Sequence, residues 1–197
     1  LLSLALLAMH SLNAEVVTYP AGVGVKTLND FSVEVRQGSG PWLPVDVYPV
    51  KVDRVDEKGH NVEVASIAVN FCNEFELNKR ARKKCEKIFQ QIEERSNFII
   101  NLSVKSDEEW EKSTKNLTRG HFDPNTFTIT IPETTYDLAC RGDRTSLFII
   151  FHELGHLFLG HRAILHNSKI PPTKNEDAEW QADTFAEIVL ERLGFCI

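Results

Sequence analysis

Two histidines and one glutamate form the most informative chemical motif of this chain. His152 and His156 stand four residues apart, and Glu153 follows the first of them directly. On an α-helix, side chains at this spacing project from one face, one turn apart, so both imidazoles can reach a single Zn²⁺. Glu153 then points toward the water that the metal activates, which is the general-base position of a metallopeptidase. The motif predicts a zinc site with a catalytic carboxylate.

The segment from Thr145 to Leu159 favours the helix that this spacing requires. It contains no proline, its one glycine lies inside the motif, and apolar residues occur on nearly every turn. A chance match to the motif usually lies on a solvated surface helix, whereas a helix that is apolar almost all round is buried. Burial of two imidazoles and a carboxylate without partners is costly, and a bound metal removes that cost.

Glu179 is the first candidate for a third zinc ligand, since a catalytic zinc has three protein ligands and one open position. It heads the apolar stripe of a helix expected after Pro172, with Asn175 as the N-cap. Ala182 in this stripe leaves room for the two helices to approach closely. We therefore expect the zinc ligands to be His152, His156 and Glu179.

His161 is the alternative third ligand. It lies five residues past His156, which on a continuing helix rotates it away from the metal, but a helix that ends at Gly160 lets it swing back. His161 and Tyr136 are also the two candidates for the donor that steadies the oxyanion of the tetrahedral intermediate. Asp183, one turn after Glu179, is expected to orient a ligand histidine by hydrogen bonding.

Two stretches of the chain resemble the ImmA/IrrE family of bacterial zinc metallopeptidases. The first is residues 136–160, which contain the histidine motif, and the second is residues 179–186, Glu-Trp-Gln-Ala-Asp-Thr-Phe-Ala. The resemblance covers roughly residues 76–193. It implies that Glu153 is the catalytic base and that the three zinc ligands are His152, His156 and Glu179.

The resemblance also implies a substrate and a location. Family members typically cleave a helix-turn-helix repressor or antitoxin encoded nearby. The resemblance therefore implies that the substrate is such a regulator and that this protein is cytoplasmic. Many relatives end the last helix in a Leu-Leu-Met-Pro-like run, whereas residues 189–193 here read Val-Leu-Glu-Arg-Leu. The resemblance therefore carries no expectation for the loops beyond that helix. The alternative function is a zinc-containing module that sequesters such a regulator without cutting it, and the intact Glu153 argues against it.

Composition narrows the class of protein further. The chain has 197 residues, 42% apolar and 25% charged, which is ordinary for a globular protein. The net charge of −6 argues against a general nucleic-acid binder. The basic run at residues 79–84 is expected to be the solvated face of a helix. Four cysteines show no Cys-x-x-Cys spacing, so they are either buried thiols in the cytosol or two disulfides in an exported protein.

The N-terminal part allows more than one interpretation. Residues 1–14 resemble the apolar core and cleavage site of a truncated signal peptide, with a buried N-terminal helix as the alternative, and the first would make the protein exported or periplasmic. Residues 1–70 weakly resemble the opening segment of secreted bacterial carbohydrate-active enzymes. Sugar chemistry would need paired catalytic acids on a much longer chain. We therefore treat residues 15–70 as a β-rich accessory segment.

The remaining pattern predicts an α+β fold in which a small sheet packs against the zinc helix. Residues 71–197 are expected to form the metallopeptidase domain, with residues 71–75 as the joint. A helix is expected at about residues 78–95. Strands are expected at residues 98–104 and 126–131, which should pair, and the second should be an edge strand that holds an extended substrate. Residues 62–69, largely apolar, are included in the β-rich segment.

Overall fold

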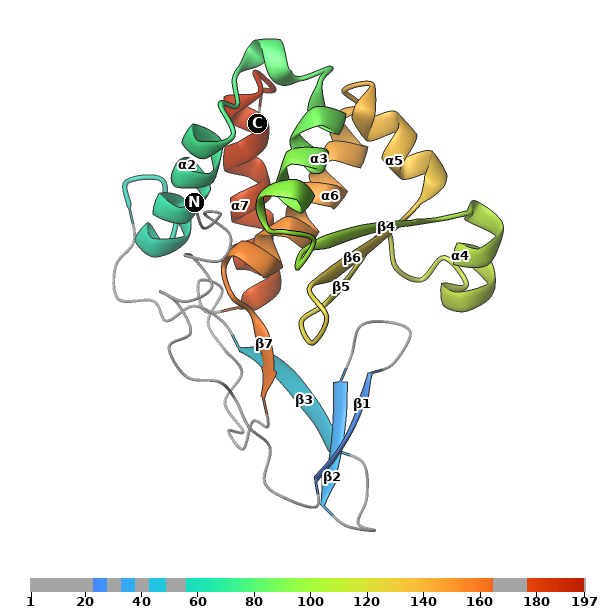
Figure 1. Cartoon of the computed structure of the whole chain (residues 1–197). Coiled ribbons are helices and arrows are strands. Elements are labelled where there is room, and N and C mark those ends of the chain that lie inside the picture. The colour runs from blue at the N-terminus through green and yellow to red at the C-terminus, as the bar shows by residue number, and fades with distance from the viewer. Residues whose placement is uncertain (1–22, 28–32, 38–42, 49–55, 165–176, 197) are drawn as a thin grey trace.

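The helices of the protein and a small mixed sheet form one α+β arrangement (Figure 1). The computed structural model describes residues 23–27, 33–37, 43–48, 56–164 and 177–196. The α-helices in these ranges are α2 (Val62–Glu74), α3 (Cys85–Arg95), α4 (Asp107–Thr114), α5 (Glu133–Cys140), α6 (Arg144–Phe158) and α7 (Ala178–Arg192). A 3₁₀ helix, η1 (Lys79–Ala81), precedes α3. The predicted α+β class is confirmed.

The mixed sheet contains β4 (Asn101–Lys105), β5 (His121–Asp123) and β6 (Thr128–Pro132), in the order β4-β6-β5. Strand β6 pairs with β4 in parallel and with β5 in antiparallel orientation, so the expected pairing of the two predicted strands is confirmed. The prediction that the second of them is an edge strand is wrong. Because β5 occupies its other side, the backbone of β6 is already hydrogen-bonded on both sides and cannot take up a substrate strand.

A second sheet joins the N-terminal region to the segment that follows α6. It contains β1 (Val23–Thr27), β2 (Val33–Gln37), β3 (Leu43–Tyr48) and β7 (Arg162–Ile164). These strands are antiparallel, in the order β1-β2-β3-β7. Strand β7 begins four residues after α6 ends, so a strand of the expected metallopeptidase domain pairs with the N-terminal segment. The apolar residues 1–14 lie outside the described residues.

Helix α2 corrects the interpretation of residues 62–69, which do not form a strand. Asn61 caps the helix, because its side-chain oxygen accepts hydrogen bonds from the backbone N–H groups of Glu63 and Val64. The buried side chains follow helical spacing; they are Val64, Ala68, Phe71 and Cys72. The helix runs on to Glu74, so the expected joint at residues 71–75 lies within and at the end of α2 instead of between two domains.

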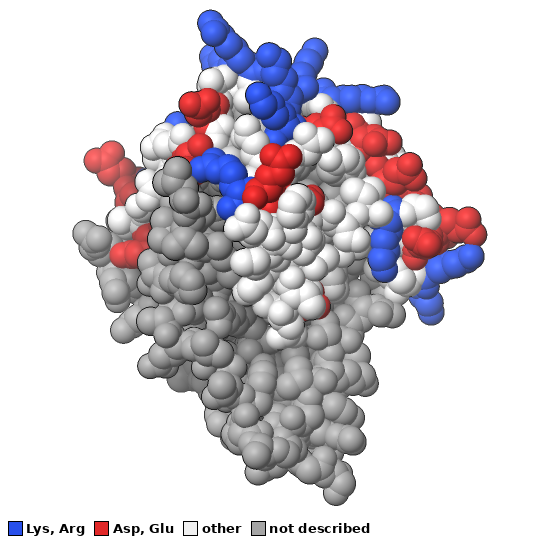
Figure 2. Space-filling view, in the orientation of Figure 1, with Lys and Arg blue, Asp and Glu red and all other residues white. Residues whose placement is uncertain are grey.

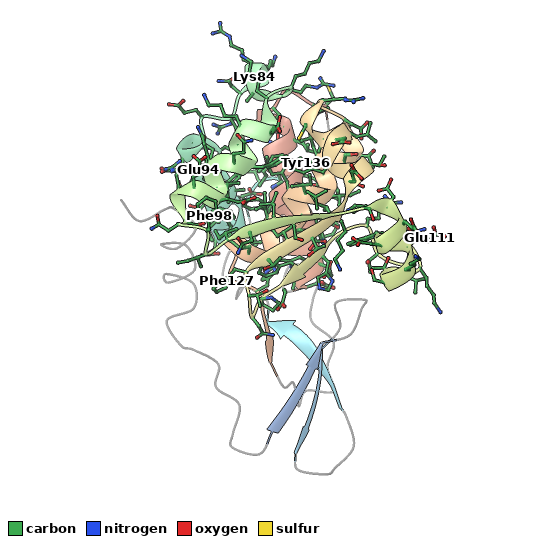
Figure 3. All side chains as sticks on the ribbon, turned by 45° about the vertical axis from the view of Figure 1, so that its right-hand side comes forward. Lys84, Glu94, Phe98, Glu111, Phe127 and Tyr136 are labelled. Carbon is green, nitrogen blue, oxygen red and sulfur yellow. The ribbon has the colours of Figure 1, made fainter. Side chains whose placement is uncertain are left out.

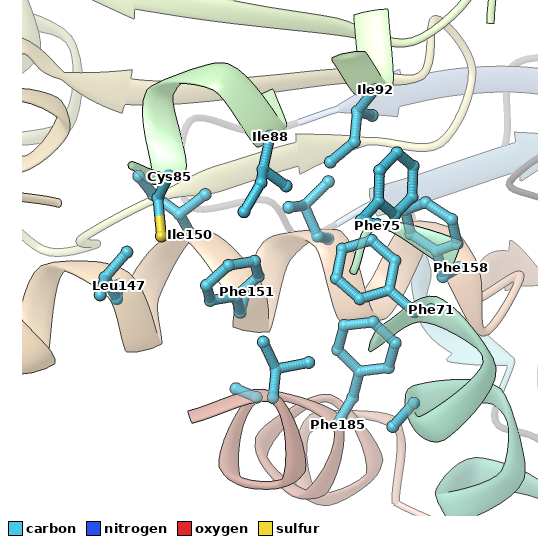
Figure 4. Close-up of a cluster of buried hydrophobic side chains, with 14 of the residues drawn as sticks. Phe71, Phe75, Cys85, Ile88, Ile92, Leu147, Ile150, Phe151, Phe158 and Phe185 are labelled. Carbon is cyan, nitrogen blue, oxygen red and sulfur yellow. The ribbon is translucent and has the colours of Figure 1, made fainter. Parts of the chain in front are cut away.

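Phe71 is the centre of an aromatic cluster that holds α2, α6 and α7 together (Figure 4). Its ring centroid lies 4.8 Å from that of Phe158, 6.1 Å from that of Phe151 and 5.3 Å from that of Phe185. All four side chains are fully buried. Because Phe151 and Phe158 belong to α6 and Phe185 to α7, this cluster fixes the two helices that carry the predicted zinc ligands.

Gly155 lets α6 and α7 approach closely. A Cβ atom at this position would lie 3.2 Å from the carbonyl oxygen of Ala182 and 3.2 Å from Cβ of Phe185. Contacts this short require the neighbour to move, so the absence of a side chain at Gly155 brings the backbones together. Ala182 is fully buried at the same contact, as its small size led us to expect.

The basic run at residues 79–84 does not lie on a helix with the following residues. It forms η1 and a turn before α3, which begins only at Cys85 and ends at Arg95. Figure 2 shows lysine and arginine side chains gathered at this end of the molecule. Lys79, Arg80 and Lys84 are exposed, in agreement with a solvated surface.

Within the described part of the chain, no helix is both long enough and apolar enough to cross a membrane.

Candidate metal centre

Helix α6 presents the two histidines of the motif on one face, as the sequence predicts. Asp143 caps its first turn, because a carboxylate oxygen accepts a hydrogen bond from the backbone N–H of Ser146 at 3.0 Å. Further along the helix, apolar side chains are buried in the core, among them Ile150, Leu154 and Phe158. His152 is half-buried and His156 is only 1% exposed.

Glu179 lies across from these histidines, on the first turn of α7. Its two carboxylate oxygens are 3.1 Å from Nε2 of His152 and 3.2 Å from Nε2 of His156. The two Nε2 atoms are themselves 3.2 Å apart. Asp177, and not Asn175 as expected, caps α7 by accepting hydrogen bonds from the backbone N–H groups of Glu179 and Trp180.

The three donor atoms of His152, His156 and Glu179 have the mutual distances of a metal cage. One ligand atom from each residue lies within 4.8 Å of the others. In a tetrahedral zinc site with bonds of 2.0–2.1 Å, adjacent ligand atoms are about 3.3 Å apart. The Nε2–Nε2 separation of 3.2 Å is close to that value, and each Nε2 atom has one of the two oxygens of Glu179 at 3.1–3.2 Å. Two imidazoles and a carboxylate are also ligands that zinc accepts, so the residues fit the ion.

Asp183 orients His152, as expected. Its carboxylate oxygen lies 2.7 Å from Nδ1 of His152, on the opposite side of the ring from Glu179. Burial disfavours the charged imidazolium, but the hydrogen bonds to Asp183 and Glu179 outweigh burial and raise the pKa of His152 to about 10. Burial also raises the pKa of Glu179, but the hydrogen bonds from the two histidines outweigh it, so this pKa lies below its usual range. These contacts join the His152 ring to both carboxylates.

His161 lies behind His156 and is not a member of the donor cluster. Its Nδ1 is 2.8 Å from Nδ1 of His156, and its Nε2 is 2.8 Å from the side-chain oxygen of Gln181. The structure therefore does not place His161 as the third ligand. Its ring contacts Nδ1 of His156, and the donor cluster lies at the other nitrogen of that imidazole, Nε2. All three side chains are almost fully buried.

The contacts of His161 fix where the protons lie. The oxygen of Gln181 can only accept, so Nε2 of His161 carries a proton and donates it. Burial, together with the neighbouring His156, lowers the pKa of His161 to about 3, so this ring is neutral and its Nδ1 is an acceptor. Nδ1 of His156 must then donate to it. In the neutral form of the His156 ring, Nε2 then has a lone pair directed at the donor cluster, as a metal ligand requires.

Glu153 is buried next to the cluster, with 8% of its surface exposed. Burial raises the pKa of its carboxyl above the usual range, against the opposing effect of His156 and His152. The backbone at Gly120 closes over it, because a Cβ atom there would lie 3.0 Å from Cγ of Glu153. A carboxyl with a raised pKa and a fixed position is suited both to take up and to release a proton.

Tyr136, the other candidate oxyanion donor, lies on α5, on the other side of the aromatic core (Figure 3). Its ring centroid is 6.0 Å from that of Phe89, and its hydroxyl hydrogen-bonds with Cys140. Burial and the neighbouring Cys140 raise its pKa. Tyr136 is absent from the described residues that line the pocket at the cluster, so it packs in the core between α3 and α5.

A pocket of about 370 Å³ opens onto the donor cluster. Besides His152, Glu153, His156, Glu179 and Asp183, its lining consists of one loop and one apolar wall: Thr118, Arg119, Gly120, Phe148 and Ile149. A larger hollow of about 620 Å³ near α2 and α7 contains none of the cluster. The sequence did not reveal the loop at residues 118–120, because only the fold brings it to α6.

Gln181 is a further residue that the sequence analysis missed, although a signal for it exists. It lies on the buried stripe of α7, between Ala178 and Phe185, where the helical period otherwise places apolar side chains. A polar residue at such a position indicates a buried hydrogen bond, here to His161.

We compared the chain with known proteins, and no family model, curated protein or solved structure matches it.

Proposed function

We propose that this protein is a zinc-dependent metallopeptidase that hydrolyses a peptide bond. The observation that carries the proposal is the convergence of Nε2 of His152, Nε2 of His156 and the carboxylate of Glu179, at separations of 3.1–3.2 Å, beside a buried glutamate. His152, His156 and Glu179 would hold the ion. When bound, zinc would lower the pKa of a water toward neutrality and polarise the scissile carbonyl.

Glu153 is the general base in this proposal. Its carboxylate accepts the proton of the attacking water and later delivers it to the leaving amine, a double role that a raised pKa favours. Asp183 holds the His152 ring, and His161 with Gln181 holds the His156 ring, so both Nε2 atoms stay directed at the ion. The pocket lining around Glu153 leaves room for a peptide segment.

The substrate is proposed from the resemblance to ImmA/IrrE peptidases. We infer a helix-turn-helix repressor or an antitoxin as the protein that is cut. Limited cleavage at one site suits a cluster at which the base is buried beside the pocket. Incubation with candidate regulators, with and without a chelator, followed by mass spectrometry of the products, identifies the substrate and the bond.

The decisive variant is Glu153→Gln. It keeps the shape of the side chain but cannot accept a proton, so bound zinc should remain at one ion per chain while peptide cleavage falls by several orders of magnitude. Glu94→Gln, an exposed glutamate on α3, is the matched control and should retain full activity. Full activity of Glu153→Gln would exclude the mechanism. If the wild-type protein binds zinc and captures a regulator intact, the protein is a sequestering module and not a peptidase.

A further inference from the structure

Arg119 is a cation in the pocket wall whose charge no described residue neutralises. Its side chain is exposed and lines the pocket that leads to the donor cluster. Within the described residues, its guanidinium makes neither an ion pair nor a hydrogen bond. Arginine is the side chain best suited to grip a carboxylate, because its planar fork donates two parallel hydrogen bonds.

The backbone that carries Arg119 is held on both sides. On one side, the indole N–H of the buried Trp110 donates to the carbonyl oxygen of Thr118 at 3.1 Å. On the other side, Gly120 approaches Glu153 so closely that an added Cβ would lie 3.0–3.2 Å from atoms of that side chain. Arg119 is therefore anchored next to the proposed general base, and only its long side chain is free to adapt to a ligand.

The carboxylates of the pocket are engaged elsewhere. Glu179 contacts both His152 and His156, and Asp183 contacts the far side of the His152 ring. Glu153 is buried beneath Gly120. Of the described residues that line the pocket, Arg119 is the one lysine or arginine. Its positive charge is therefore available to a negative group that enters from solvent.

The wall beside the cluster is apolar. Phe148 and Ile149 line the pocket, and both are half-buried. The Phe148 ring lies 6.2 Å from the His152 ring, measured between centroids. A peptide that reaches the cluster therefore meets a hydrocarbon surface on one side and the guanidinium of Arg119 at the mouth.

We propose that Arg119 selects peptides that carry a carboxylate close to the scissile bond. This inference rests on the proposed peptidase function and adds a substrate class to it. The carboxylate can belong to an aspartate or glutamate side chain, or to the C-terminus of the substrate. In either case the guanidinium forms a charge-assisted, two-pronged hydrogen bond with it, while a neighbouring apolar side chain packs on Phe148 and Ile149.

The test uses peptide hydroxamates, which ligate zinc and bind without being cut. Two series extend the peptide from either side of the hydroxamate, and each contains matched aspartate, asparagine and lysine members. The series that carries the hydroxamate at its N-terminal end also contains matched free and amidated C-termini. Dissociation constants for the zinc-loaded protein are measured by calorimetry. We expect the carboxylate members to bind about tenfold more tightly than their neutral partners. Whichever pair differs, side chain or C-terminus, identifies the source of the carboxylate.

Variants of Arg119 then test whether this residue causes the preference for carboxylates. Arg119→Gln should abolish the tenfold difference, and Arg119→Glu should invert it in favour of peptides that carry lysine. Arg80→Gln removes the same charge from an exposed site on η1, outside the pocket, and should leave the preference unchanged. The zinc content of all variants should equal that of the wild type.

The outcomes separate this inference from the function on which it rests. Zinc-dependent binding without any preference for carboxylates, or a preference that survives in Arg119→Gln, overturns the role of Arg119 and leaves the peptidase proposal standing. If no hydroxamate of either series binds the zinc-loaded protein, both proposals fall.

Discussion

The Nδ1 atoms of His156 and His161 lie 2.8 Å apart, on the side of the His156 ring that faces away from Glu179. Because Nε2 of His161 donates its hydrogen bond to the oxygen of Gln181, Nδ1 of His161 is left to accept the hydrogen bond that Nδ1 of His156 donates. A histidine that looked like a third ligand in the sequence thus sets the tautomer of a ligand histidine.

His161→Phe should weaken zinc binding about 10- to 100-fold, as expected for loss of a partner that orients a metal ligand. His161→Gln retains an acceptor for Nδ1 of His156 and should lose less affinity. Competition with a chromophoric chelator measures both. His60→Phe, a histidine in the turn before α2, is the matched control. Equal affinities of His161→Phe and the wild type would show that the tautomer is set in another way.

Gly155→Val should separate α6 from α7 and remove the third zinc ligand. The first carbon of the new side chain would already lie 3.2 Å from the carbonyl oxygen of Ala182, and its methyl groups have no space. We expect a loss of about 1–3 kcal/mol in the free energy of unfolding, together with a large fall in zinc stoichiometry. Urea denaturation and metal analysis measure the two effects.

Gly155→Ala provides the graded comparison. It adds only the Cβ atom and gains helix propensity of about 1 kcal/mol, so its effect on unfolding should be small. A Gly155→Val variant that binds one zinc ion with the stability of the wild type would contradict the role given to this close helix contact.

Zinc should stabilise the folded protein, and its removal should destabilise it. An ion that binds only the folded state at about 100 times its dissociation constant adds about 2.7 kcal/mol, which for a chain of this size raises Tm by about 5–10 °C. Thermal unfolding with zinc, with magnesium and with a chelator measures the effect. His152→Ala should abolish the zinc-dependent shift. A shift of equal size with magnesium would argue against a site made of imidazoles.

The buried thiols Cys72 and Cys85 should make the protein less stable at high pH. Burial raises the pKa of Cys72 to about 11 and that of Cys85 to about 12, from an ordinary value near 9. The folded state therefore favours the neutral thiols, so their contribution is fully present below about pH 9 and is lost as the pH rises through about 11–12.

Urea denaturation from about pH 8 to about pH 11 measures this loss, and the free energy of unfolding should fall over that range. The double variant with Cys72→Ala and Cys85→Ala should show a shallower decline, since both groups that release protons on unfolding are gone. Cys196→Ala, at an exposed cysteine, should follow the wild type. Parallel curves for all three proteins would mean that other groups cause the alkaline loss.

The sequence alone predicted the local features of the metal centre. The spacing of His152 and His156 placed both on one helical face because the helical repeat is a local property, and α6 has the predicted extent to within one residue at each end. Glu179, which heads the buried stripe of α7, and Asp183 one turn later both lie at hydrogen-bond distance from His152, where the sequence led us to expect them.

Where several local structures suit the same residues, the sequence was ambiguous. The apolar run at residues 62–69 suits a buried strand or a buried helix, and the cap at Asn61 together with the contacts of Phe71 selects the helix. A strand was predicted at residues 126–131, and β6 forms at Thr128–Pro132. Strand β5, which places β6 in the middle of the sheet, is only three residues long and carries no pattern of its own.

Only the tertiary structure decided which distant groups meet. The His161 ring could swing toward the ligands or away from them, and the buried oxygen of Gln181 fixes it behind His156. The approach of Gly120 to Glu153, and with it the place of Arg119, depends on packing between segments about 30 residues apart. Helical periodicity depends on residues that are neighbours in the sequence, so a short stretch of sequence is enough to predict it. The hydrogen-bond partners in a core depend on the whole fold, because only one arrangement leaves the buried polar groups paired.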